Sequence, residues 1–149
     1  MNFKNNSGIT IVALIVTVII IGIISGIVIY NGTDAIDTSK DDILKSELGM
    51  VQHAVLEQYM KYKTTNNEED LLGVNVDETT KLKTIANELN IILLRDSGYY
   101  ELDKDSIFVL GIEQSKNSYI INYSSGEVIN ITQKKTSSGE SLYIKGNNF

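Results

Sequence analysis

The side chains that could do chemistry in this chain are few and scattered. His53 is the single histidine, it lies next to Gln52, and there is no cysteine. A catalytic base needs a nucleophile, and a metal ligand needs other ligands, within reach. The sequence places neither beside His53, so we interpret it as a solvated or partly packed helical residue and expect no enzyme. The lack of cysteine also excludes disulfides and thiolate metal sites.

Four acidic residues form the second candidate site, in a segment rich in turn residues: Asp96, Glu101, Asp103 and Asp105. Carboxylate oxygens are the ligands that calcium prefers. The spacing of a calcium-binding loop is absent, however. We interpret the group as solvated loop charge, with a calcium site as the alternative, and we expect no cofactor.

The charge of the chain limits its partners. The formal net charge is −6 at pH 7, from 13 basic and 19 acidic side chains. Surfaces that bind nucleic acid are basic, because they neutralise phosphates. A nucleic-acid partner is therefore not favoured.

An uncharged stretch at residues 9–30 must position everything that follows it. As a helix, its 22 residues cover roughly 33 Å, about the thickness of a bilayer hydrocarbon core. Lys4 precedes it, and Asp34 and Asp37 follow it, which favours a cytoplasmic N-terminus and an external C-terminus. A secretory signal peptide is the alternative, but the stretch is long for one and no small-residue cleavage site closes it.

The residues around the start of this stretch resemble the class III signal of type IV pilins and pseudopilins: Lys4, then Ser7-Gly8-Ile9-Thr10, with Gly22 inside the apolar run. In that family a prepilin peptidase cuts on the cytoplasmic side after the glycine and methylates the new N-terminus. The resemblance implies cleavage between Gly8 and Ile9 and methylation of Ile9. The version with alanine at position 13 is similar to pilin-like proteins of Gram-positive, clostridial-type bacteria.

Two features depart from the family pattern. The fifth residue after the cut is usually a glutamate that pairs with the amine of a neighbouring subunit, and here it is Ala13. The helix-breaking proline is missing as well, since the chain has no proline. Gly22 and Gly26 form a small-xxx-small pair that lets helices approach closely in lipid. We expect this pair to set subunit register, with recruitment by glutamate-bearing partner subunits as the alternative.

Apolar residues continue at spacings of three, four and seven after the uncharged stretch and predict an amphipathic helix to about Lys63: Ile36, Ile43, Leu44, Leu48, Val51, Val55, Tyr59 and Tyr62. Beyond a polar loop at 64–70, the patterns predict a helix at 79–89, strands at 91–94 and 99–102, a brief helix capped by Asp103 and ended by Gly111, a hairpin of 118–123 with 127–131, and an edge strand at 142–144.

The expected fold is α+β, with a long N-terminal membrane-spanning helix whose outer half packs on a small antiparallel sheet, which is the ladle shape that the resemblance implies. The expected divisions are a leader at 1–8, a transmembrane and filament-core helix at 9–31, its amphipathic continuation at 32–63, and an α/β head at 64–149.

The expected function is that of a structural subunit, a pilin or pseudopilin in the cell membrane that later enters a type IV pilus-like or type II secretion-like filament. Its expected partners are prepilin peptidase, the membrane, and copies of itself or other pilin-like subunits. An uncleaved, signal-anchored extracellular binding module is the alternative.

Overall fold

The computed structural model describes residues 7–77 and 79–146, without the side chains of residues 7–13 and 22–35. The chain is an α+β protein and divides into two compact units, residues 1–40 and 41–149. Helix α1, Ser7–Thr65, has residues in both units. Each unit is described by itself below.

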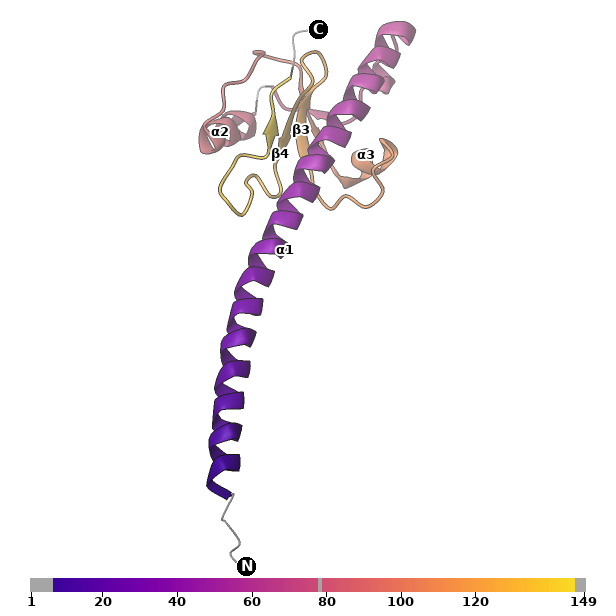
Figure 1. Cartoon of the computed structure of the whole chain (residues 1–149). Helices are drawn as coiled ribbons and strands as arrows, with labels where there is room; N and C mark the ends of the chain where they lie inside the picture. The colour runs from indigo at the N-terminus through magenta and orange to yellow at the C-terminus, as the bar shows by residue number, and fades with distance from the viewer. Residues whose placement is uncertain (1–6, 78, 147–149) are drawn as a thin grey trace, which may run out of the picture. The chain divides into compact units, whose positions relative to one another are not determined.

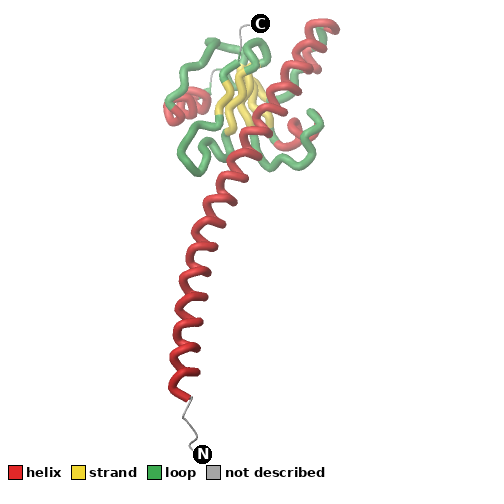
Figure 2. The backbone as a smooth tube through the Cα atoms, viewed as in Figure 1, coloured by secondary structure: helices red, strands yellow, loops and turns green. Residues whose placement is uncertain are grey.

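The second unit is built on one five-stranded antiparallel sheet, whose strands lie in the order of the sequence (Figure 2). Its strands are β1 Val74–Asn75, β2 Tyr99–Leu102, β3 Tyr119–Asn122, β4 Glu127–Asn130 and β5 Tyr143–Ile144. The 3-10 helix η1 Glu68–Asp70 precedes β1, helix α2 Thr80–Leu89 lies between β1 and β2 in the chain, and helix α3 Lys104–Val109 lies between β2 and β3.

The hairpin of β3 and β4 forms the centre of the sheet. Tyr119 pairs with Asn130 and Asn122 pairs with Glu127, in the antiparallel register. The connecting turn closes when the Gly126 N–H donates to the Asn122 carbonyl at 2.8 Å. Gly126 has a φ of 69°, which a residue without Cβ adopts at little cost.

The C-terminal part of α1 covers one face of this sheet (Figure 1). Leu48, Val51 and Val55 are buried against side chains that alternate along the central strands, because successive residues of a strand point to opposite faces. The sheet side of this cluster is made by Leu102, Tyr119, Ile121, Tyr123 and Val128. Leu44 and Tyr59 extend the packed stripe at both ends.

Helix α2 covers the opposite face. Leu82, Ile85 and Leu89 pack on the other set of alternating residues, Tyr99, Ile120 and Ile129. Helices on both faces leave the central strands without access to water, and all eight residues of β3 and β4 are buried. This arrangement decides which polar residues must find partners inside the protein.

Most of the elements expected in this unit are confirmed. The helix at 79–89, the strand at 99–102, the central hairpin and the edge strand at 142–144 are present, with ends that differ by one or two residues. Asp103 caps α3, since its Oδ1 accepts from the Ser106 N–H at 2.9 Å, and Gly111 follows with a φ of 85°. The expected amphipathic stripe on α1 is confirmed from Leu44 to Tyr59, whereas Ile36 and Ile43 are exposed.

The expected strand at 91–94 is wrong. Its backbone donors are used outside the sheet: the Ile91 N–H donates to the Ala86 carbonyl as part of the cap of α2, and the Leu94 N–H donates to the Glu127 side chain. Ile91 and Leu93 instead pack against the α2 cluster as irregular chain. The two-residue strand β1 was not expected, because two residues carry no readable alternation.

In the first unit, residues 14–21 lie in the helix with exposed side chains. Among the residues that the structure describes, no helix is long and apolar enough to cross a membrane. The expected span at 9–30 lies mostly outside the described side chains, so it stays a prediction.

The burial of Leu48 leads to a stability prediction. Its side chain is 3% exposed in the α1 cluster, so Leu48→Ala should lower the free energy of unfolding by about 2 to 5 kcal/mol through lost burial and a residual cavity. Urea unfolding of the full chain in detergent micelles measures this. Met60→Ala, on the same helix at 67% exposure, is the control and should change stability by less than about 0.5 kcal/mol. Equal effects of the two variants would contradict the assigned packing.

Candidate functional site

The expected processing site lies in the first turn of α1. Gly8 and Ile9 are the second and third residues of the helix as the structure describes it, from Ser7 onward. The side chain of Ile9 lies outside the described residues, as do the surroundings of Gly22 and Gly26. The expected roles of these four positions stay predictions.

The structure does not bring the candidate residues for catalysis or calcium together. His53 is exposed on α1. Glu101 pairs with Lys81, at 2.5 Å between Oε1 and Nζ, and Asp103 is held by its cap. Hydrogen bonds from the Ser106 N–H and then its hydroxyl lower the pKa of Asp103. Over the described parts of the chain, no three His, Asp or Glu side chains are grouped to hold a metal ion.

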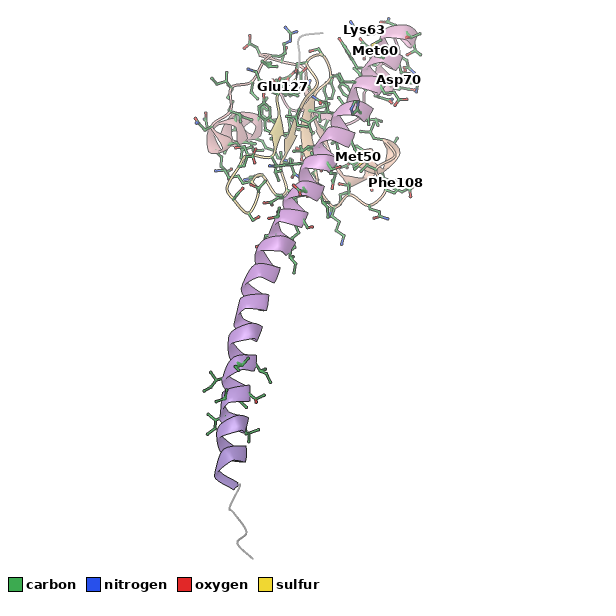
Figure 3. All side chains as sticks on the ribbon, viewed as in Figure 1. Met50, Met60, Lys63, Asp70, Phe108 and Glu127 are labelled. Carbon is green, nitrogen blue, oxygen red and sulfur yellow. The ribbon has the colours of Figure 1, made fainter. Side chains whose placement is uncertain are left out.

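The carboxylate of Glu127, at the start of β4, is a fully enclosed charged group of the second unit. Its side chain is 0% exposed and receives two hydrogen bonds on each oxygen. The Leu94 N–H (3.0 Å) and the Tyr143 hydroxyl (2.8 Å) donate to Oε1. The hydroxyls of Tyr99 (2.7 Å) and Ser125 (2.8 Å) donate to Oε2. The carboxylate therefore joins β2, β5, the hairpin turn and the 91–94 segment. Figure 3 labels Glu127 beside the sheet.

A second carboxylate, Glu47, joins α1 to the segment that enters β3. Its Oε1 accepts from the hydroxyls of Ser115 and Tyr119 and from the Asn117 amide, the last at 3.1 Å. Glu47 is 9% exposed. These three hydrogen bonds add to the apolar contacts of Leu48 and Val51, and together they fix the orientation of the C-terminal part of α1 on the sheet face.

The tyrosines of the sheet have altered acidity because they are buried. Burial, followed by the hydrogen bonds to Glu127, raises the pKa of Tyr99 and of Tyr143. Burial and then the bond to Glu47 raise the pKa of Tyr119. Burial raises the pKa of Tyr123, whose hydroxyl donates to the Leu72 carbonyl at 2.9 Å, to about 12. These tyrosines act as neutral hydrogen-bond donors at ordinary pH.

An open cleft of about 540 Å³ lies between α2 and the sheet. Its charged side chains are already paired: Lys81 with Glu101 at 2.5 Å and Lys134 with Glu88 at 2.7 Å. Hydroxyls make up much of the remaining lining, from Thr80, Thr84, Ser118 and Thr132. The cleft presents neutral polar groups and no unpaired lysine or glutamate to a ligand.

Neither buried carboxylate was expected from the sequence, although each carried a signal. Glu127 lies two residues before Ile129, so strand alternation puts both on the same inward face. Glu47 lies three residues after Leu44 and four before Val51, which puts it on the buried stripe of α1. A charged residue in phase with an apolar stripe is the pattern that could have identified both.

Comparison of the chain with family models, with curated proteins and with solved structures found no match.

Glu127 leads to the second prediction. Glu127→Val leaves four donors without this acceptor, two of them in buried hydrogen bonds and two in half-buried ones. It should lower the free energy of unfolding by at least about 3 kcal/mol. Glu127→Gln should cost about 1 to 2 kcal/mol, because the amide oxygen can still accept from Leu94 and the hydroxyls of Tyr99 and Ser125 can rotate to accept from the amide nitrogen. Urea unfolding of the full chain in detergent ranks these variants. The exposed Glu113→Val is the control and should be nearly neutral. A Gln variant as unstable as the Val variant would contradict the described bonding.

The raised tyrosine pKa values predict instability in alkali. The folded protein holds the Tyr123 proton to about pH 12, whereas the unfolded chain releases it near the ordinary value of 10.0. The contribution of Tyr123 is therefore complete below pH 10 and is lost as the pH rises from 10 to about 12, on the order of 2 to 3 kcal/mol. Tyr123→Phe should flatten this part of the stability profile, measured by urea unfolding at several pH values. A profile of unchanged slope would show that Tyr123 ionises equally in both states.

Proposed function

We propose that this chain is a structural subunit, a pilin or pseudopilin, of a type IV pilus-like or type II secretion-like filament. It is made as a single-pass membrane precursor with a cytoplasmic N-terminus and an extracellular head, and it is cleaved after Gly8. The observation that carries the proposal is the N-terminal junction, Lys4 and Ser7-Gly8-Ile9-Thr10 followed by an uncharged stretch to Tyr30. Prepilin peptidase is the enzyme that such a junction would engage.

The fold of the second unit supports the proposal. The resemblance implies a helix that packs on an antiparallel sheet, and residues 44–59 of α1 pack in that way on the face formed by β2, β3 and β4. The backbone is helical from Ser7 through Thr65, so the uncharged stretch and the packed stripe belong to one helix. These features agree with the resemblance, but the junction remains the specific feature.

Assembly would replace contacts between the uncharged helix and lipid by contacts between the helices of different subunits. In the membrane the uncharged helix contacts lipid, and in a filament core it would contact the same helix of other subunits. Small residues such as Gly22 and Gly26 permit close approach, which strengthens dispersion contacts where no hydrophobic driving force exists. A glutamate in this helix would be costly, by about 2.5 to 3.5 kcal/mol at the bilayer centre and less near the interface. Ala13 avoids that cost, but it cannot form the glutamate–amine pair that the family resemblance implies.

An anchored extracellular binding module is the second candidate function. The observation that favours it is the open cleft beside α2, which is large enough for a small polar ligand and lined with hydroxyls. In that case α1 would only tether the head, and the N-terminus would stay uncut. The mass of the mature protein separates the two candidates.

The Gly8→Val variant tests the proposal. The branched Cβ of valine crowds a peptidase subsite that fits glycine, so the uncut precursor should accumulate in the membrane. Intact mass and N-terminal sequencing measure the fraction that has lost residues 1–8. The matched control is Gly22→Leu with Gly26→Leu, which should be cut at the same bond but should enter filaments less well than the parent. If the parent chain keeps its first eight residues in a cell that processes its own pilins, the proposal fails.

A further inference from the structure

Three carboxylates of the described second unit are buried: Glu47, Asp70 and Glu127. Asp70 is paired with Lys61, whereas the two glutamates have no ion pair among the residues that the structure describes and differ in how fully they are hydrogen-bonded. Glu127 receives two donors on each oxygen. Glu47 receives three donors, all on Oε1. Among the described residues no donor contacts its Oε2, and this oxygen is reached by solvent, since it is not among the fully buried atoms that lack a partner. Glu127 is thus complete within the chain, whereas Glu47 has one oxygen available.

Glu47 lines a groove of about 300 Å³ between α1 and the segment after α3. The walls of the groove are largely apolar: Ile43 and Met50 come from α1 and Ile112 from the opposite segment. Ile43 is 64% and Met50 is 50% exposed, and Figure 3 labels Met50 on α1. Glu47, whose Oε2 has no donor among the described residues, therefore lines a groove with exposed apolar walls.

In the described second unit, residues 41–77 and 79–146, no positively charged side chain forms an ion pair with Glu47. Its three partners are a serine, an asparagine and a tyrosine, which are neutral donors. The tyrosine stays protonated, because burial and then the hydrogen bond to Glu47 raise the pKa of Tyr119. A carboxylate that is largely withdrawn from water is stabilised when a cation approaches it.

The geometry selects the kind of cation. The guanidinium of arginine binds best when its fork meets both oxygens of a carboxylate, and Oε1 is already occupied. An ammonium is a compact charge that needs one oxygen. Its methylene stem can lie along apolar surface while the charged end reaches a polar partner, and the walls of Ile43, Met50 and Ile112 provide such a surface.

We propose that the Glu47 groove receives a lysine side chain from a second copy of this chain. The inference rests on the proposed function, in which copies of the chain pack together. Charge complementarity supports a copy as the partner: the chain has twelve lysines and one arginine. Six exposed lysines of the described second unit form no ion pair: Lys63, Lys83, Lys104, Lys116, Lys135 and Lys145.

Zero-length cross-linking of the full chain in its membrane tests the inference. A carbodiimide joins a carboxylate to a nearby amine as an amide, with the carbodiimide released as a urea. Chains labelled with heavy and light nitrogen are produced together and cross-linked, and the linked peptides are identified by mass spectrometry. We expect peptides in which Glu47 of a light chain is joined to a lysine of a heavy chain, and the reverse.

Three results would overturn the inference. Glu47 could be joined only to lysines of its own copy, it could be joined to a lysine of another protein, or it could form no cross-link while exposed carboxylates do. Each of these is decisive whether or not filaments form. Cleavage after Gly8 is measured by intact mass in the same sample, so a processed chain without the Glu47 cross-link refutes only this inference. An unprocessed chain with the cross-link refutes only the proposed function.

A variant provides an independent measurement. Glu47→Gln keeps an amide oxygen for the three donors on Oε1 and places an amide nitrogen where Oε2 was, so the fold should be retained and the ammonium rejected. We expect self-association of the full chain, measured by sedimentation in detergent, to weaken at least about tenfold. Glu57→Gln, an exposed glutamate of α1, makes the same change of charge and should leave self-association unchanged. Unchanged self-association of a folded Glu47→Gln chain overturns the inference.

Discussion

The enclosure of β3 and β4 between two helices is the constraint on which the second unit depends. Leu48, Val51 and Val55 of α1 close one face and Leu82, Ile85 and Leu89 of α2 close the other, so both strands are buried throughout. An antiparallel sheet can leave one face in water, and a hairpin alone is marginally stable. The packing of α1 therefore does more than attach a helix: it provides the apolar cover that makes these short strands stable.

This enclosure also explains the polar chemistry inside the unit. A buried polar group that lacks a partner is costly, so each one must be bonded within the chain. The side-chain oxygen of Asn122 is bonded at the hairpin turn, where Oδ1 accepts from the backbone N–H groups of Ser124 and Ser125. The carboxylate of Glu127 is bonded by four donors, which come from β2, β5, the hairpin turn and the 91–94 segment. Among the described residues, the Asn130 Nδ2 is the one buried side-chain nitrogen or oxygen without a partner. The network is thus nearly complete, and Glu127 belongs to the architecture.

Much of the second unit could be predicted from local patterns, because its helices and most of its strands carry their own signals. Leu82, Ile85 and Leu89 repeat at helical spacing, Asp103 is a capping residue followed by a helical turn, and Gly126 lies in the turn between two runs rich in β-branched residues. The failure at 91–94 has a physical cause. Four consecutive apolar residues fit a strand or an irregular packed segment equally well, and a side chain 33 positions away, Glu127, decides the outcome by accepting the Leu94 N–H. The donors that meet at Glu47, up to 72 positions away, could not be predicted for the same reason: the register of α1 on the sheet brings them together.

Under the proposed function, the bonding of Glu47 also bears on how subunits could keep their register. A carboxylate in the apolar stretch would have to be desolvated in lipid before it met a partner, and Ala13 removes that requirement. Glu47 differs, because three donors already bind its Oε1 in the folded unit and only Oε2 has no donor among the described residues. The cost of its burial is met mostly within one chain, so a partner cation adds stability without having to compensate for the full desolvation. Under the proposed function, directional charge contacts would then come from the sheet-packed part of α1, and the apolar stretch would contribute close packing at Gly22 and Gly26. Such a division needs no ionisable group inside the membrane, which suits a helix whose residues 9–30 carry none.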